Sequence, residues 1–378
     1  MNILFLDQFS DLGGAQQCLL DLVPSMQASE WSLTCAVPGN GALIEKLRGL
    51  GVPVHSLHIA PLASGHKTTL DFLRFGLDAP RLANDISRLA AEIRADLLYV
   101  NGPRILPAAA WAARKSGRPL VFHCHNHLSE TSVRKLAGYS LQLAAARVIA
   151  CCRHVARPLW PFIDPGRLHV IYNGVAEMVS TRPIDGSGPR VGLIGRIAPE
   201  KGQVEFVLAA QRLVAKHPQC RFVICGAPLF SNIEAERYFE RVQEIAAGLP
   251  VEFCGWQEDV NAVLARLDVL VVPSLREPGA PRVILEAFAT RVPVVAFVSG
   301  GIPELVIQNR TGFLVEPPEP ETLAARLDAL LSAPGQLRAV ADHAYEAWKE
   351  KFTLDRYQRD VLAVIGLTQT LPATGRSI

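Results

Sequence analysis

Short apolar runs alternate along the chain with longer segments in which apolar residues recur at helical spacing. The apolar runs, each predicted to be a strand, are residues 2–7, 32–37, 97–100, 120–123, 148–150 and 169–172, then 190–195, 221–225, 251–253, 269–272 and 294–297. Predicted helices between them include residues 203–216, 233–247 and 283–291. The runs are rich in Val, Ile and Leu, as is typical of strands covered on both faces. Their alternation with helices predicts an α/β fold with parallel sheets.

The chain is expected to form two domains. A length of 378 residues exceeds what one hydrophobic core usually supports. Residues 181–189 are polar, rich in Pro and Gly, and lie between two predicted strands, so they mark a boundary. We predict two doubly wound domains, residues 1–181 and 190–353, facing each other across a cleft at the carboxyl ends of their strands. Residues 354–378 are predicted to form a helix that packs back on the first domain, followed by a tail.

Composition narrows the class of protein. Hydrophobic residues make up 49% of the chain and charged residues 20%, which is globular composition. A net charge of +2 argues against a nucleic-acid partner. No apolar run reaches the 18 residues of a membrane-spanning helix, and the first apolar run is too short for a signal peptide. The eight cysteines show no C-x-x-C spacing, so we predict no zinc site and a reducing, cytoplasmic compartment.

Glycine pairs follow two of the predicted strands and open helices. Gly13 and Gly14 follow the first strand, and Gly300 and Gly301 follow the strand at 294–297. Glycine lets a backbone approach a ligand closely, and a helix N-terminus favours an anion. For the first pair alone, a tight strand-to-helix turn is an equally good interpretation. Neither pair forms G-x-G-x-x-G, which disfavours an NAD-dependent oxidoreductase.

Two cations lie at the end of the strand at 190–195. Arg196 and Lys201 are five residues apart and are bracketed by Gly195 and Gly202. A departing diphosphate needs compensation for its negative charge, which arginine and lysine can supply without a metal ion. A solvated loop with a surface pair between Glu200 and Lys201 is the alternative. The position at a strand's carboxyl end favours the first interpretation.

A second loop of this kind spans residues 273–287. A strand runs there into a turn rich in Pro and Gly and then into a helix, whose N-terminus suits a phosphate. Glu286 lies in the first turns of that helix. It could accept hydrogen bonds from a ribose diol, or it could only be a partner of the helix dipole.

Three histidines, His123, His125 and His127, alternate near the end of the strand at 120–123. Alternate side chains of a strand share a face, so the spacing suggests a metal site. The motif contains no carboxylate, however, and the chain contains no Asp-x-Asp. We therefore predict no metal, and expect one histidine to hydrogen-bond a sugar hydroxyl.

In this order, these stretches resemble the retaining glycosyltransferases of the two-Rossmann-domain type (GT-B), family 4 or group 1. The resemblance is strongest over residues 191–315, including 253–256 and 309–315. It implies transfer of a sugar, with retention of anomeric configuration, from a nucleoside-diphosphate sugar to a hydroxyl of a glycan or lipid-linked acceptor. It also implies a role in polysaccharide biosynthesis, with no cofactor and no metal.

The resemblance also implies roles for individual residues. Arg196 and Lys201 would hold the donor diphosphate, and Glu286 the ribose. His125 is the best match for the residue that contacts the donor sugar, and His123 is the second candidate. The catalytic set is therefore His125, Arg196, Lys201 and Glu277, and the donor-binding set is Gly13, Gly14, Arg196, Lys201, Gly226, Phe253, Val283 and Glu286. We expect Arg196→Ala and Lys201→Ala to fold normally and to lose transfer.

One departure concerns Glu277. The family usually has a glutamate eight residues before the ribose-binding one, whereas Glu277 precedes Glu286 by nine and Pro278 occupies the expected position. Either the loop absorbs the extra residue and Glu277 reaches the site, or that role is lost. We favour the first interpretation, while a non-catalytic sugar-nucleotide-binding protein stays open as an alternative.

Two other enzyme classes fit the sequence less well. A sugar-nucleotide epimerase would need acidic groups around the sugar, and a phosphorylase would need a lysine-bound pyridoxal cofactor and a longer chain.

The segment from Arg134 to Arg157 is basic with apolar residues between. It could contact an anionic membrane peripherally, or it could be an ordinary solvated helix face.

Overall fold

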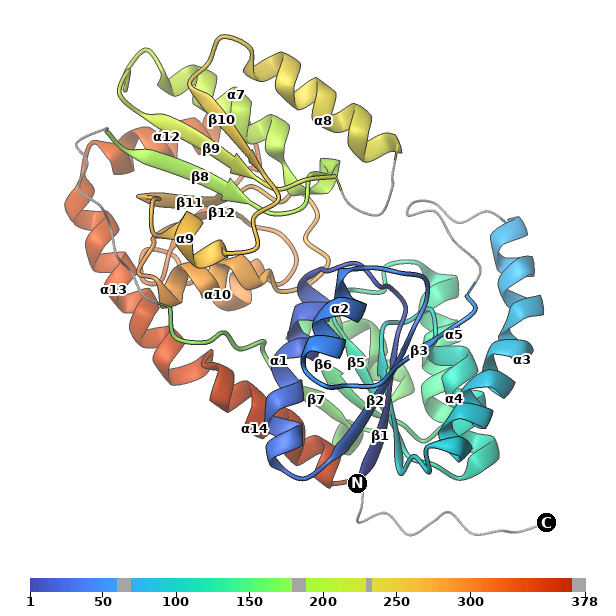
Figure 1. Ribbon diagram of the computed structural model, residues 1–378. Coiled ribbons are helices and arrows are strands. Elements are labelled where there is room, and N and C mark those ends of the chain that lie inside the picture. The colour runs from blue at the N-terminus through green and yellow to red at the C-terminus, as the bar shows by residue number, and fades with distance from the viewer. Residues whose placement is uncertain (60–68, 179–187, 229–232, 369–378) are drawn as a thin grey trace. The chain divides into compact units, whose positions relative to one another are not determined.

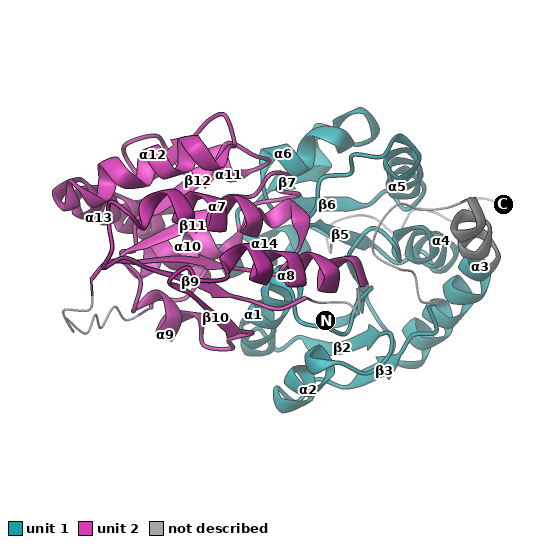
Figure 2. Cartoon of the chain, turned by 90° about the horizontal axis from the view of Figure 1, so that it is seen from above, with its two compact units in different colours: residues 1–172, 356–378 teal, residues 173–355 magenta. Residues whose placement is uncertain are grey.

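The computed structural model describes residues 1–59, 69–178, 188–228 and 233–368. The chain divides into two compact units, which Figure 2 shows in teal and magenta. Unit 1 comprises residues 1–172 and 356–378, and unit 2 comprises residues 173–355. Residues 173–178, which the sequence assigned to the first domain, therefore belong to unit 2. Most of the predicted boundary segment, residues 179–187, lies outside the described residues, as does the tail at 369–378.

Unit 1 is built on a parallel sheet of seven strands (Figure 1), in the order β3-β2-β1-β4-β5-β6-β7. Its strands are β1 (Asn2–Asp7), β2 (Ser32–Val37), β3 (Val54–Ser56), β4 (Leu97–Asn101), β5 (Leu120–Cys124), β6 (Arg147–Ala150) and β7 (Leu168–Val170). The strand order reverses between β1 and β4, and ligands of such sheets bind beyond the carboxyl ends at that point. The register pairs Asp7 with Asn101 and Asn101 with His123, so polar residues meet at this edge.

Helices follow the strands of unit 1 in the Rossmann-like pattern. They are α1 (Gly14–Ala28), α2 (Ala42–Gly49), α3 (Thr69–Glu92), α4 (Leu106–Ser116), α5 (Thr131–Leu143) and α6 (Arg153–Ala156), with 3-10 turns η1 (Arg157–Phe162) and η2 (Pro165–Arg167). The last helix, α14 (Leu354–Gly366), contacts α1. Tyr357 is buried and its hydroxyl donates to the carbonyl of Cys18 at 3.4 Å, while the Gln358 amide donates to the carbonyl of Asp21 at 2.6 Å.

Unit 2 has a parallel sheet of six strands in the order β10-β9-β8-β11-β12-β13. Its strands are β8 (Arg190–Ile194), β9 (Arg221–Cys225), β10 (Val251–Gly255), β11 (Val269–Val272), β12 (Val294–Phe297) and β13 (Phe313–Val315). Its helices are η3 (Pro199–Lys201), α7 (Gln203–Leu213), α8 (Ile233–Ala246), α9 (Val260–Leu264), α10 (Arg282–Ala289), α11 (Ile302–Leu305), α12 (Pro320–Leu331) and α13 (Pro334–Lys351). Phe206 of α7 and Phe222 of β9 meet edge to face in its core, with ring centroids 6.0 Å apart.

The prediction of two Rossmann-like domains, each with a parallel sheet, is confirmed. Two strands were not predicted: β3 and β13 have three residues each. Among the described residues, no helix is long and apolar enough to cross a membrane.

Candidate functional site

In unit 2, three loops at the carboxyl ends of strands come into backbone contact. After β8 the chain passes through η3, and α7 begins at Gln203. Gly202 has a φ of +75°, and a Cβ there would lie 1.9 Å from the carbonyl oxygen of Pro273, which follows β11. Gly226, after β9, is equally constrained, because its Cβ would lie 1.9 Å from the carbonyl oxygen of Gly195. Glycine at these two positions therefore allows the backbones of the loops after β8, β9 and β11 to approach one another closely.

The Lys201 ammonium lies 2.7 Å from a carboxylate oxygen of Glu277. The Lys201 side chain is 21% exposed and the Glu277 side chain 4%, so the pair is largely removed from water. The backbone N–H of Glu277 donates to the Ser299 hydroxyl at 2.8 Å. Gly300 has a φ of +53°, and its Cβ would lie 2.0 Å from the carbonyl oxygen of Glu277. Despite the nine-residue spacing to Glu286, the loop brings Glu277 to Lys201.

Arg196 forms an ion pair with Glu200, four residues later. The two side chains are 26% and 30% exposed. The carbonyl oxygen of Arg196 accepts a hydrogen bond from the Gln203 amide at 2.9 Å, and that of Glu200 accepts one from the backbone N–H of Leu275 at 2.9 Å. The pair between Glu200 and Lys201 that the sequence left open is therefore absent among the described contacts, because Glu200 faces Arg196. Each cation carries a carboxylate counterion that an incoming diphosphate would have to displace or share.

Glu286 lies one turn into α10, after Pro281 at the helix N-cap. Its carboxylate is 3.5 Å from the guanidinium of Arg282, which also donates to the carbonyl of Gly174 at 3.1 Å. Both side chains are mostly buried, at 13% and 12% exposure. Val283 beside them is partly exposed. Arg282 was not predicted as a site residue, although its spacing of four residues from Glu286 could have indicated it.

Phe253 and the first glycine pair complete the predicted donor set. Phe253 lies on β10, where its ring meets that of Phe239 with centroids 5.7 Å apart. In unit 1, Gly13 is the N-cap of α1 and Gly14 its first residue. Gly13 has an extended φ of −133°, which residues other than glycine also adopt. The pair is therefore a helix start at a strand's carboxyl end, as predicted, but its backbone angles do not require glycine at position 13.

His125 belongs to a polar cluster at the carboxyl ends of the strands of the unit 1 sheet. Its Nε2 lies 2.7 Å from the side-chain oxygen of Asn101, whose Nδ2 donates to Asp7 at 2.5 Å. Gln16 of α1 also donates to Asp7, at 3.0 and 3.2 Å. Asp7 is fully buried, and burial raises its pKa to about 6 although these hydrogen bonds lower it. Asp7, Gln16 and Asn101 were not predicted as site residues. For Asp7 and Asn101 the available signal was a polar residue that ends a buried apolar run.

His123 lies in the core of the sheet instead. Its Nδ1 is 2.6 Å from the Tyr99 hydroxyl, and its ring centroid is 4.0 Å from that of His125. Burial holds the pKa of His123 well below its usual range, so the ring is neutral. The third histidine, His127, stacks on His154 at 4.2 Å. Within the described ranges, no group of three or more His, Cys, Asp or Glu residues could hold a metal ion.

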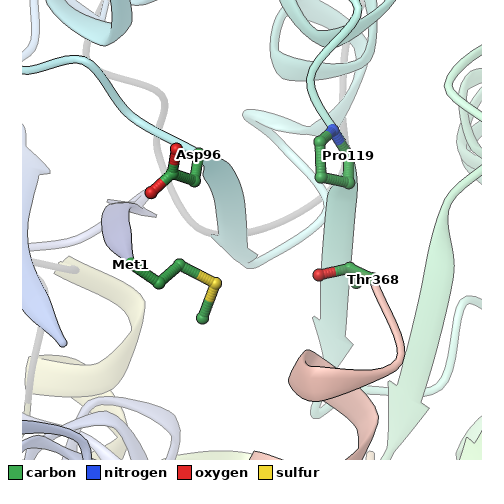
Figure 3. Close-up of a pocket in the computed structure, with 4 residues that line it drawn as sticks. All are labelled: Met1, Asp96, Pro119 and Thr368. Atoms are coloured by element: carbon green, nitrogen blue, oxygen red, sulfur yellow. The ribbon is translucent and has the colours of Figure 1, made fainter. Parts of the chain in front are cut away.

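A small pocket of about 280 Å³ opens at the amino ends of the strands of the same sheet. Figure 3 shows Met1, Asp96, Pro119 and Thr368 around it. Met1, Asp96 and Pro119 precede β1, β4 and β5, so they lie at the amino ends of the strands. Ligands of doubly wound sheets bind at the carboxyl ends, and we assign no role to this pocket.

Comparisons with known proteins agree with this geometry. Residues 188–333 match the family model described as glycosyl transferases group 1, and residues 12–177 match the one described as glycosyltransferase family 4. The α-maltose-1-phosphate synthase of Mycolicibacterium smegmatis is 31% identical over 220 residues, covering 51% of this chain and 55% of that protein. The D-inositol 3-phosphate glycosyltransferase of Corynebacterium urealyticum is 29% identical over 190 residues, covering 49% of this chain and 44% of that protein. The chain thus spans about half the length of these curated relatives.

Solved structures match over nearly the whole chain. Anabaena HepE, in complex with UDP and glucose, is 26% identical with a TM-score of 0.83, covering 97% of this chain and 99% of that one. The same protein has been solved with UDP-glucose, again at 26% identity, with a TM-score of 0.82 and coverage of 97% and 100%. The two family models together match most of the chain, and the fold agrees over 97% of it. The chain therefore belongs to the GT-B glycosyltransferases of family 4 (group 1).

Proposed function

We propose that this protein transfers a sugar from a nucleoside-diphosphate sugar to an acceptor hydroxyl, with retention of anomeric configuration, in the biosynthesis of a polysaccharide. The observation that carries the proposal is the pair of Lys201 and Glu277 at the strand ends of unit 2, with Arg196 on the same loop. A cation that is shielded from water stabilises a developing phosphate charge far better than a solvated one. The UDP-glucose complex of Anabaena HepE makes a UDP-sugar the first donor to test.

Each site residue has a distinct task in this proposal. Arg196 and Lys201 stabilise the departing diphosphate, each by about 2–4 kcal/mol at the transition state. Glu286 holds the ribose, and Gly226, Phe253 and Val283 line the donor site. Glu277 lies beside the diphosphate through its ion pair with Lys201, and His125 contacts the donor sugar. The departing phosphate accepts the acceptor's proton on the same face, so no protein nucleophile takes part.

Donor binding is proposed to be independent of metal. Two cations and the N-terminus of α10, all in unit 2, can balance a diphosphate without a divalent ion. This predicts the same donor affinity with magnesium and with a chelator. A requirement for magnesium would contradict the assignment of Arg196 and Lys201 as the groups that hold the diphosphate.

The acceptor is proposed to be a glycan or lipid-linked molecule reached at an anionic membrane surface. Residues 131–163 contain five lysines and arginines and no aspartate or glutamate. Large apolar side chains are exposed on the same segment, namely Leu136, Tyr139 and Leu143 of α5 and Trp160 of η1. Basic residues near an anionic surface contribute about 1 kcal/mol each, and interfacial aromatic residues add to that.

Sedimentation with anionic liposomes tests this surface. We expect binding at low salt that weakens as salt is raised, and loss of binding in the double variant Tyr139→Ser and Trp160→Ser. Trp256→Ser is the matched control, because Trp256 is also exposed but belongs to unit 2. Absence of binding at low salt would contradict the membrane proposal and would leave the proposed donor site unaffected.

The transfer itself is tested first by binding and then by turnover. Thermal unfolding is measured with UDP, GDP, ADP, NAD and their common sugar conjugates, where a ligand at 100 times its Kd adds about 2.7 kcal/mol. The responding donor is then incubated with candidate acceptors, and the anomeric configuration of the product is read by NMR. Arg196→Ala should abolish transfer, whereas Arg212→Ala, which removes a surface pair with Glu321, should not. Binding without product would support the non-catalytic alternative, and a changed sugar on the same nucleotide would support an epimerase.

A further inference from the structure

A continuous chain of hydrogen bonds joins three neighbouring strand ends of unit 1. Asp7 ends β1, Asn101 ends β4, and His125 follows β5 directly. The Asp7 carboxylate accepts from Asn101 at 2.5 Å, from Gln16 at 3.0 and 3.2 Å, and from the backbone N–H of Phe9 at 2.9 Å. The Asn101 carbonyl oxygen then lies 2.7 Å from His125 Nε2.

The chemistry of these groups fixes the direction of every hydrogen bond. An ionised carboxylate only accepts, so Asn101 has to turn its NH2 group toward Asp7. Its carbonyl oxygen therefore faces His125, and an amide oxygen also only accepts. His125 Nε2 has to carry the proton, which makes Nδ1 the acceptor nitrogen of the neutral ring. The charge on Asp7 thus sets the tautomer of His125, to which it is linked by two successive hydrogen bonds through Asn101.

Within the described part of the chain, the groups that donate to the Asp7 carboxylate are uncharged. The donors to its carboxylate are two side-chain amides and the backbone N–H groups of Phe9 and Gln8. Of the titratable groups, Cys35 of β2 interacts with Asp7 electrostatically, and His125 is joined to it through Asn101. Burying a carboxylate among neutral donors costs stability that a neutral residue of the same shape would not. A buried charge with this cost beside a proposed site residue indicates a functional role.

We infer that Asp7 is a positioning residue that fixes, through Asn101, the orientation and tautomer of His125, the side chain proposed to contact the donor sugar. The inference rests on the proposed function. Asp7 touches neither donor nor acceptor in this scheme. The effect reaches the reaction only by holding one ring nitrogen protonated and the imidazole in one rotamer, since a misplaced group near a reacting centre can lower the rate by about 100-fold.

The experiment is a set of double-mutant cycles on transfer kinetics. We expect Asp7→Asn and Asn101→Ala each to lower kcat by about 10- to 100-fold while the Kd for UDP changes by less than about twofold. In a His125→Ala background, neither substitution should lower kcat further, because its route to the donor is already gone. Asp96→Asn is the control, since Asp96 accepts from the Asn2 backbone at 2.7 Å at the opposite edge of the sheet. It should keep wild-type kinetics.

Two results would overturn the inference. One is wild-type kcat in both Asp7→Asn and Asn101→Ala while His125→Ala is inactive. The other is an equal fractional loss with and without His125, which would mean that Asp7 acts by another route. If Asp7→Asn does not fold, Asn101→Ala carries the same test.

Failure of the proposed function is distinguishable from failure of this inference. If the wild-type protein transfers no sugar, the function is wrong, and the positioning role is then judged without turnover. In protein with 15N-labelled histidine, a slowly exchanging Nε2–H resonance that disappears in His125→Ala should be present in the wild type and absent in Asn101→Ala. A wild-type spectrum that lacks this resonance would overturn the inference.

Discussion

Replacing Asp7 by asparagine should stabilise the protein, and the gain should depend on pH. Burial raises the pKa of Asp7 from 3.8 to about 6, against the opposing hydrogen bonds from Asn101, Phe9 and Gln16. The folded protein therefore binds this proton more tightly than the unfolded chain does. The stability that protonated Asp7 contributes is fully present below pH 3.8 and is lost as pH rises through about 6. The difference corresponds to about 3 kcal/mol.

Asparagine mimics the protonated acid at every pH, which gives the expected magnitude. At pH 8, Asp7→Asn should be about 3 kcal/mol more stable than the wild type, and at pH 5 the advantage should be about 1.4 kcal/mol smaller. In a domain of the size of unit 1, which contains Asp7, each kcal/mol of stability moves Tm by about 2–4 °C. Urea and thermal unfolding, followed by circular dichroism at both pH values, provide the measurement. Asp96→Asn serves as the control, and its difference from the wild type should not vary with pH in this way.

The opposite sign would refute the reasoning. If Asp7→Asn is less stable than the wild type at pH 8, the hydrogen bonds to the carboxylate outweigh the cost of its burial. A gain of equal size at pH 5 and pH 8 would also contradict it, because the gain would then not come from titration of Asp7. A variant that is more stable and less active would fit a residue kept for function at a cost in stability.

The remaining predictions concern pH, the buried ion pair and one glycine. Wild-type kcat should fall as pH drops below about 6, because a protonated Asp7 can donate as well as accept and no longer forces Asn101 to turn its NH2 group toward it. Asp7→Asn should lack this limb in a pH–rate profile. Lys201→Ala should lose about 3 kcal/mol in urea unfolding, because it leaves the Glu277 carboxylate buried without its cation, and Lys201→Ala with Glu277→Gln should recover most of that loss; a fully stable single variant would contradict the burial argument. Gly300→Ala should lower Tm and abolish transfer by displacing the Glu277 backbone, whereas Gly335→Ala in α13, with open space around it, should leave both unchanged.

Much of the fold follows from the sequence because buried parallel strands leave a direct trace. Runs such as residues 269–272 are apolar throughout, and the structure places β11 there. Strand β3 leaves no apolar run, because its three residues are Val54, His55 and Ser56. Strand β13 is an apolar run of three residues that was not predicted, although β7, which is equally short, was. Their place at or near sheet edges is set by neighbouring strands, which only the assembled sheet reveals.

The candidate site in unit 2 was predictable by position but not by pairing. Arg196, Lys201 and Glu286 follow strands or begin helices, and the sequence shows that directly. It does not show that Glu200 forms an ion pair with Arg196, or that Lys201 forms one with Glu277, which is 76 residues away. This pairing also changes one expectation: Lys201→Ala was expected to fold normally, whereas the burial of Glu277 now predicts a loss of stability.

The cluster around Asp7 shows why the unit 1 site was harder to predict. Asp7 and Asn101 are 94 residues apart, and each is a single polar residue at the end of an apolar run. Such a residue usually only marks where a strand reaches water. Here β1 and β4 are neighbours at the reversal of strand order, and the register places the two residues side by side, with Asn101 in hydrogen-bonding distance of His125. Strand order is a property of the whole sheet, so the network exists only once β4 has been placed next to β1. A polar residue that ends a buried strand is therefore a candidate positioning residue when its strand lies next to such a reversal.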